Sequence, residues 1–210
     1  MRKCLDVNKG RRGLLLGAVC AAGLMAAPAW ALQYEGFDVP ESVTLGGVPL
    51  VLNGVGMRAV AVLKGYSAAL YLSGKSQQPS EVLANTGPKR VQIRMLLQIS
   101  VGAEEFVKAI NKGVQRNCSE AERLAVADRV AQLNTNLRSI GKVSRKDLIN
   151  LDYLPDKGLV LSVNGRITGE PLPGADLYGA ILKVFLGEQP VDRKLKAGML
   201  GLPVPEPRST

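Results

Sequence analysis

The chain has 210 residues, of which 46% are hydrophobic and 21% charged, and its formal net charge is +9. A chain of this length favours one globular domain with a core large enough to fold alone. The absence of histidine and the presence of only three cysteines exclude Ser-His-Asp and Cys-His catalysis, histidine-containing zinc sites and four-cysteine metal sites.

Residues 1–31 are typical of an export signal. Five basic residues precede an apolar run over residues 13–27, and Ala29-Trp30-Ala31 is a small-x-small cleavage site. A membrane-spanning helix needs about 20 apolar residues, and this run is shorter. We therefore expect cleavage after Ala31, a periplasmic or secreted protein of residues 32–210, and no stable membrane anchor. The pair Arg11-Arg12 leaves the general secretory and twin-arginine routes both open.

The charge of the remaining chain is modest and mixed. Five of the 27 basic residues and one of the 18 acidic residues lie in the leader, so the rest carries a net charge of +5. Acidic and basic residues are also interspersed along the segment 120–129. This mixture is typical of a solvated surface, and we expect no nucleic-acid partner.

The first strands are expected over residues 43–52 and 59–72, which are rich in Val, Leu, Ala and Tyr. Gly46-Gly47 and Asn53-Gly54-Val55-Gly56 interrupt them, and the second sequence predicts a tight connection that positions Arg58. The third glycine of a dinucleotide loop and the Gly-Lys-Ser/Thr of a P-loop are both missing. We expect neither a cofactor nor a metal.

The next segments alternate between strand and helix signals. Apolar and polar residues alternate from Val91 to Ile99, which predicts a strand with one buried face. A helix is expected over 103–114. Ser119 and Glu122 form a capping box for a longer helix, whose apolar stripe runs from 126 to 140 and ends at Gly141.

The C-terminal third predicts a hairpin followed by two helices. Residues 159–163 alternate in polarity, Asn164-Gly165 has the composition of a type I′ turn, and a return strand is expected over 166–170. Helices are expected over 177–185 and 192–200. Antiparallel strands with segregated helices predict an α+β fold, in which helices cover one face of a single sheet.

Arg58 is the most informative candidate site residue. If 59–72 is one strand, Arg58 and Tyr66 share one face with apolar neighbours, but at a separation of about 27 Å. They could then contact one ligand only if the chain bends between 59 and 65. An arginine in apolar surroundings needs an anionic partner. That partner is either a protein carboxylate, the commoner arrangement, or a ligand.

The chain resembles the bacterial branch of the chalcone isomerase-like family over about residues 34–202. The resemblance rests on the glycine-rich sequence that ends at Arg58, on Lys64-Gly65-Tyr66-Ser67-Ala68-Ala69-Leu70-Tyr71-Leu72, and on the closing pattern over 174–190 and 195–201. It implies an open-faced β-sandwich, with a large antiparallel sheet under a layer of helices and a ligand cleft between them.

The resemblance also implies a set of cleft residues. Arg58 matches the arginine that holds the nascent phenolate in plant isomerases, and the substrate-binding threonine falls on Tyr66. The cleft tyrosine falls near Phe106, the cleft asparagine near Lys112 or Gly113, and the serine or threonine of the penultimate helix near Val184. An arginine followed by a tyrosine is similar to the fatty-acid-binding members, where both groups hold a carboxylate.

We therefore expect a non-catalytic, exported protein that binds a small apolar carboxylic acid through Arg58, Tyr66, Phe106 and Val184. The alternative is an intramolecular lyase, a chalcone-type isomerase that relies on Arg58 alone. A third possibility is an accessory protein whose cleft is filled by its own side chains. The sequence leaves the ligand and the oligomeric state open.

Overall fold

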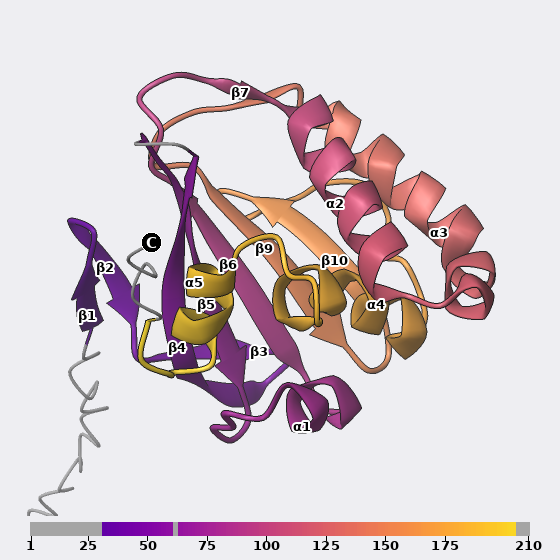
Figure 1. Ribbon diagram of the computed structural model, residues 1–210, viewed down its shortest axis with the longest axis horizontal. Helices are drawn as coiled ribbons and strands as arrows, with labels where there is room; N and C mark the ends of the chain where they lie inside the picture. Colours follow the sequence, from indigo (N-terminus) through magenta and orange to yellow (C-terminus); the bar gives the residue numbers. More distant parts are fainter. Residues whose placement is uncertain (1–30, 61–62, 205–210) are drawn as a thin grey trace, which may run out of the picture.

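The computed structural model describes residues 31–60 and 63–204 (Figure 1). Apart from Ala31, the expected leader lies outside these residues. Seven antiparallel strands form one curled sheet in the order β11-β10-β9-β6-β5-β4-β3. Their bounds are β3 Ser42–Leu45, β4 Val48–Val60, β5 Leu63–Leu72, β6 Lys89–Met95, β9 Leu148–Leu154, β10 Gly158–Val163 and β11 Arg166–Ile167. Two short antiparallel ribbons pair β1 (Ala31–Tyr34) with β2 (Phe37–Pro40) and β7 (Val101–Gly102) with β8 (Lys142–Val143).

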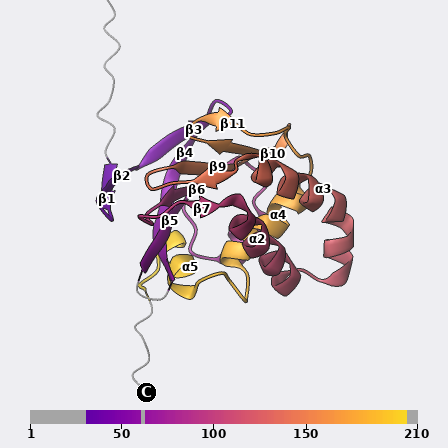
Figure 2. The same cartoon turned by 90° about the horizontal axis from the view of Figure 1, so that it is seen from above.

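Helices cover one face of this sheet, as Figure 2 shows from above. The layer consists of α2 (Ala103–Asn117), α3 (Glu120–Ser139) and α4 (Ala175–Leu186), which pack against one another. The short α1 (Pro79–Ala84) contacts α4, and α5 (Arg193–Met199) packs on β4 and β5. The main core lies between sheet and helices, so the predicted α+β architecture is confirmed.

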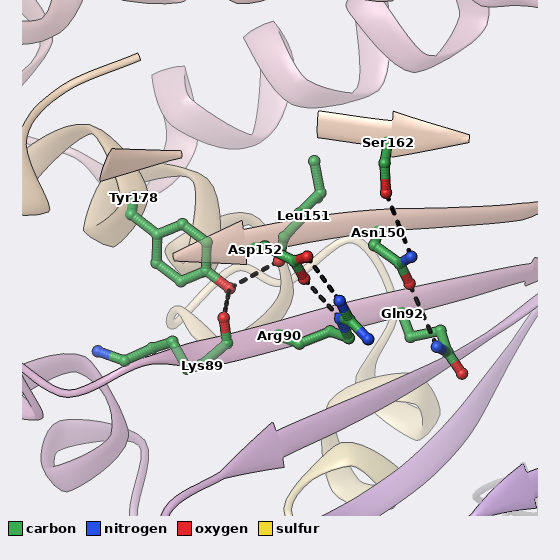
Figure 3. Close-up of polar contacts among 8 residues, drawn as sticks. All are labelled: Lys89, Arg90, Gln92, Asn150, Leu151, Asp152, Ser162 and Tyr178. Atoms are coloured by element: carbon green, nitrogen blue, oxygen red, sulfur yellow. Dashed lines mark hydrogen bonds and ion pairs between the residues drawn. The ribbon is translucent and has the colours of Figure 1, made fainter. Parts of the chain in front are cut away.

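Strand β6 shows how alternation builds the two faces of the sheet. Its odd-numbered residues are buried toward the helices, as predicted from the pattern. On the opposite face Arg90 donates two hydrogen bonds to the carboxylate of Asp152 on β9, at 2.6 and 2.7 Å (Figure 3). The prediction that this strand extends to Ile99 is wrong, because β6 ends at Met95. Beyond it, the Leu97 amide bonds the Gly65 carbonyl and Ile99 is exposed.

Two local predictions are confirmed. Ser119 and Glu122 form the capping box of α3, with each side chain accepting a hydrogen bond from the other residue's backbone N–H. Asn164 and Gly165 both have positive φ, as a type I′ turn requires, and join β10 to β11. The return strand ends at Ile167 rather than at residue 170. Gly169, with φ +72°, is no longer in the extended conformation.

The glycine-rich sequence does not form the expected turn. Strand β4 continues through Asn53–Gly56, with a register shift in its pairing with β5 between Leu52 and Gly54. It ends at Val60, which pairs antiparallel with Leu63 at the start of β5. Residues 59–72 are therefore the end of β4 and the whole of β5, not one strand. The expectation failed because residues 60–63 contain none of the Gly, Pro, Asn or Asp that mark tight turns.

The glycines of β4 serve instead to admit helix α5. A Cβ on Gly54 would lie 2.2 Å from the Gly198 carbonyl oxygen, and one on Gly56 would lie 2.4 Å from the Leu195 carbonyl oxygen. The buried Asn53 amide donates to the Met199 carbonyl at 2.8 Å. Helix α5 therefore lies directly on the backbone of β4, and its contact with Gly56 is two residues before Arg58.

Candidate functional site

A cavity of about 380 Å³ lies between the sheet and the helix layer. Its floor is formed by Ile93 and Met95 of β6 and by Ile149 and Leu151 of β9, all of them buried. Helices α2, α3 and α4 supply the opposite wall. Strands β6 and β9 are neighbours in the sheet, and these four residues all point to its helix face. They therefore form one continuous apolar surface.

Arg58 and Tyr66 lie together at one side of this cavity. They are directly opposed across the β4–β5 hairpin, and the Arg58 Cζ is 5.9 Å from the centre of the Tyr66 ring. Opposed residues on antiparallel strands have Cβ atoms about 5 Å apart. The expected separation of about 27 Å along one strand is therefore wrong, because a hairpin turn separates the two residues.

Arg58 is a partly buried cation that pairs with no carboxylate of the part of the chain that the structure describes. The six ion pairs formed within residues 31–60 and 63–204 do not include it. The sequence allowed an internal salt bridge between Arg58 and a protein carboxylate, and no such salt bridge is formed within these residues. The nearby Asp192 caps helix α5, where its carboxylate accepts the Leu195 N–H at 2.9 Å.

Burial raises the pKa of Tyr66 to about 12, and Asp192 acts in the same direction. The positive charge of Arg58 and its hydrogen bond oppose that rise. The Tyr66 hydroxyl therefore stays protonated at neutral pH. Together the two side chains offer a guanidinium and a phenolic O–H, two kinds of donor that suit a carboxylate or another oxyanion.

The other two expected site residues lie on the helical wall of the same cavity. Phe106 on α2 is partly buried and Val184 on α4 is buried. A Cβ on Gly113 would lie 2.5 Å from Val184 Cγ1, so Gly113 permits the close contact of α2 with α4. Neither Phe106 nor Val184 has a hydrogen-bonding group. The structure thus brings all four expected residues around one cavity, and their role in binding stays a prediction.

The rim of the cavity carries charges that sequence reasoning did not assign. Lys108 pairs with Glu105 at 2.8 Å, and the exposed Lys112 lines the cavity where the family resemblance implied an asparagine. The floor residues were also missed. Their alternation marked them as buried, but only the pairing of β6 with β9 brings them beneath one cavity.

No histidine is present, and the described residues hold no cluster of three Cys, Asp or Glu side chains placed to bind a metal. Over residues 31–60 and 63–204, none of the helices is long and apolar enough to cross a membrane. The cavity is an apolar space with two hydrogen-bond donors, Arg58 and Tyr66, at one side and a charged rim.

Comparison with known proteins gives a family and a fold. A family model described as chalcone isomerase-like matches residues 31–201. Curated protein sequences contain no match to the chain. Among solved structures, a fatty-acid binding protein of Arabidopsis thaliana superposes with a TM-score of 0.61 at 15% sequence identity. The similarity covers 81% of this chain and 96% of that one.

Proposed function

The chain belongs to the chalcone isomerase-like family, and from this membership we propose that it is an exported, non-catalytic protein that binds a small apolar carboxylic acid, such as a fatty acid, in its cleft. The observation that carries the proposal is the Arg58–Tyr66 pair at the side of an apolar cavity, where Arg58 forms no ion pair with any carboxylate of residues 31–60 and 63–204. The guanidinium holds the carboxylate through paired hydrogen bonds, and the Tyr66 hydroxyl donates a further one.

The walls of the cavity support an aliphatic chain as the rest of the ligand. The floor is apolar, and on the helical wall the side chains of Phe106 and Val184 present only carbon to the cavity. The Arabidopsis protein of similar fold is a fatty-acid binding protein, which supports the same ligand class.

Affinity is expected to rise with the chain length of the fatty acid. Each buried CH₂ contributes about 0.8 kcal/mol, which corresponds to roughly a fourfold lower Kd per carbon until the cavity is full. Isothermal titration with the saturated acids from hexanoate to tetradecanoate measures this slope. An affinity independent of chain length would contradict an apolar cavity as the acyl site.

The location of the acyl chain is tested by filling the cavity. Ala109 on α2 is partly buried and lines it, so Ala109→Trp is expected to weaken dodecanoate binding by at least about tenfold. Ala121→Trp is the matched control, since Ala121 is exposed on α3. Equal affinities of the two variants would place the acyl chain elsewhere.

Catalysis of chalcone cyclisation is the second candidate function, because the family resemblance matches Arg58 to the arginine that holds the nascent phenolate in plant isomerases. The apolar Phe106 and Val184 leave Tyr66 as the one hydroxyl group among the expected site residues. We expect the wild-type protein to leave cyclisation at its uncatalysed rate. Acceleration by the wild type that Arg58→Ala abolishes would favour the isomerase instead.

Export is the remaining part of the proposal. The basic segment, the short apolar run and Ala29-Trp30-Ala31 support cleavage after Ala31. N-terminal sequencing of the protein from the periplasm or medium should begin at Leu32. Recovery of the protein from membranes with Met1 in place would contradict cleavage.

A further inference from the structure

A second cavity, of about 400 Å³, shares no lining residue with the cleft. It is bounded by the end of α1 and the loop that follows, by the first turns of α3, by one side of α4 from Ala175 to Lys183, and by the ends of β6 and β9 nearest that loop. Most of its surface is apolar side chain and tyrosine ring, but Lys89 also lines it. The function proposed for the cleft gives Lys89 no role.

Lys89 occupies a core position. It is the first residue of β6 and has the same parity as Val91 and Ile93, so its side chain lies on the helix face and is only 3% exposed. Its Nζ lies 5.2 Å from the ring centre of Tyr153 and 6.0 Å from that of Tyr178. Figure 3 shows the side chain extending away from the Arg90–Asp152 ion pair, beside Tyr178.

The amine of Lys89 has a hydrogen bond but forms no ion pair with the carboxylates that the structure describes. Its Nζ donates to the backbone carbonyl of Asn85. None of the ion pairs within residues 31–60 and 63–204 includes Lys89. The two carboxylates that line the cavity are engaged elsewhere, Glu122 by Lys183 and Asp176 by Arg129, each at 2.6 Å.

Desolvation makes this amine easier to deprotonate than a surface lysine. Burial lowers the pKa of Lys89 to about 8, so roughly a tenth of it is uncharged at pH 7. A neutral amine that donates one hydrogen to the Asn85 carbonyl keeps its lone pair free for an electrophile. Lysines activated in this way are the ones that form Schiff bases.

We propose that the second cavity binds an apolar aldehyde or ketone and that Lys89 condenses with it to form an imine. The Lys89 nitrogen forms a bond to the carbonyl carbon, and the carbonyl oxygen leaves as water with the two hydrogens of the amine. Hydrolysis reverses the step, and no oxidant or reductant is needed. A neutral carbonyl compound suits the cavity better than an anion, because Glu122 and Asp176 also line it.

Reductive trapping tests the proposal on the mature protein. Benzaldehyde and cyanoborohydride are added at pH 7, and the modified lysines are mapped by peptide mass spectrometry over time. Lys89 is expected to be modified at least about tenfold faster than the exposed Lys75, because so little of a normal lysine is uncharged at this pH. This advantage should shrink near pH 10. Modification of Lys75 without Lys89 would overturn the proposal.

Two controls separate this site from its surroundings. Lys89→Arg should remove the fast phase, whereas Lys183→Arg, at the rim of the same cavity, should keep it. A fast phase that survives Lys89→Arg would assign the reactive amine to another lysine. Saturating dodecanoate should leave the labelling rate unchanged if the two cavities are independent. Protection of Lys89 by dodecanoate would contradict a separate carbonyl site.

Discussion

Replacement of Arg58 by alanine is expected to lower the affinity for dodecanoate by about a hundredfold or more. The guanidinium makes charge-assisted hydrogen bonds to the carboxylate, and bonds to charged groups contribute about 1.5–3 kcal/mol each. The fold should survive, because Arg58 is only partly buried and forms no ion pair within residues 31–60 and 63–204. Isothermal titration gives the Kd, and circular dichroism with a thermal scan checks the fold.

Two variants control for charge and for geometry. Arg58→Lys should give an intermediate affinity, because an ammonium keeps the charge but loses the paired contact. Lys108→Ala removes a rim cation that already pairs with Glu105, and its effect should be small. Unchanged affinity in Arg58→Ala, together with a normal fold, would show that Arg58 does not hold the ligand.

Replacement of Gly56 by alanine is expected to lower the free energy of unfolding strongly for the addition of a single methyl group. The new Cβ would lie 2.4 Å from the Leu195 carbonyl oxygen and 2.8 Å from Leu195 Cα, which are backbone atoms. Overpacking of a rigid site costs about 1–3 kcal/mol or more. Helix α5 must move off β4, and Leu195 and Met199, both fully buried, would lose their packing.

Gly74→Ala is the matched control for this prediction, because a Cβ on Gly74 would meet no atom within 4 Å. Urea denaturation of both variants gives the difference in the free energy of unfolding. Gly56→Ala should also weaken dodecanoate binding, since Arg58 follows two residues later on the same face of β4. Equal stabilities of the two variants would contradict the close packing of α5 on β4.

Local signals in the sequence predicted much of this fold. The alternation in β6, the capping box of α3 and the Asn164-Gly165 turn each depend on short-range physics, and each is found in the structure. The hairpin between β4 and β5 could not be predicted in this way. Residues 60–63 are all apolar in the sequence and include no turn-forming residue, so the hairpin is recognised only from the pairing of β4 with β5.

The candidate site was predicted only in part, because it too depends on contacts between residues that are distant in the sequence. The glycine-rich sequence drew attention to Arg58, but glycines that admit a helix have the same signature as glycines that form a turn. The proximity of Tyr66 depends on the hairpin and could not be derived from spacing along the chain. Lys89 did leave a signal, because it has the parity of the buried residues Val91, Ile93 and Met95.

The central claim is that Arg58 and Tyr66 hold a carboxylate at the side of the apolar cleft. A crystal structure of the mature protein with dodecanoate tests it most directly. We expect the carboxylate oxygens within hydrogen-bond distance of the Arg58 guanidinium and the Tyr66 hydroxyl, with the acyl chain over Ile93 and Met95. A structure in which Arg58 pairs with a protein carboxylate, and dodecanoate lies outside the cleft, would contradict the claim.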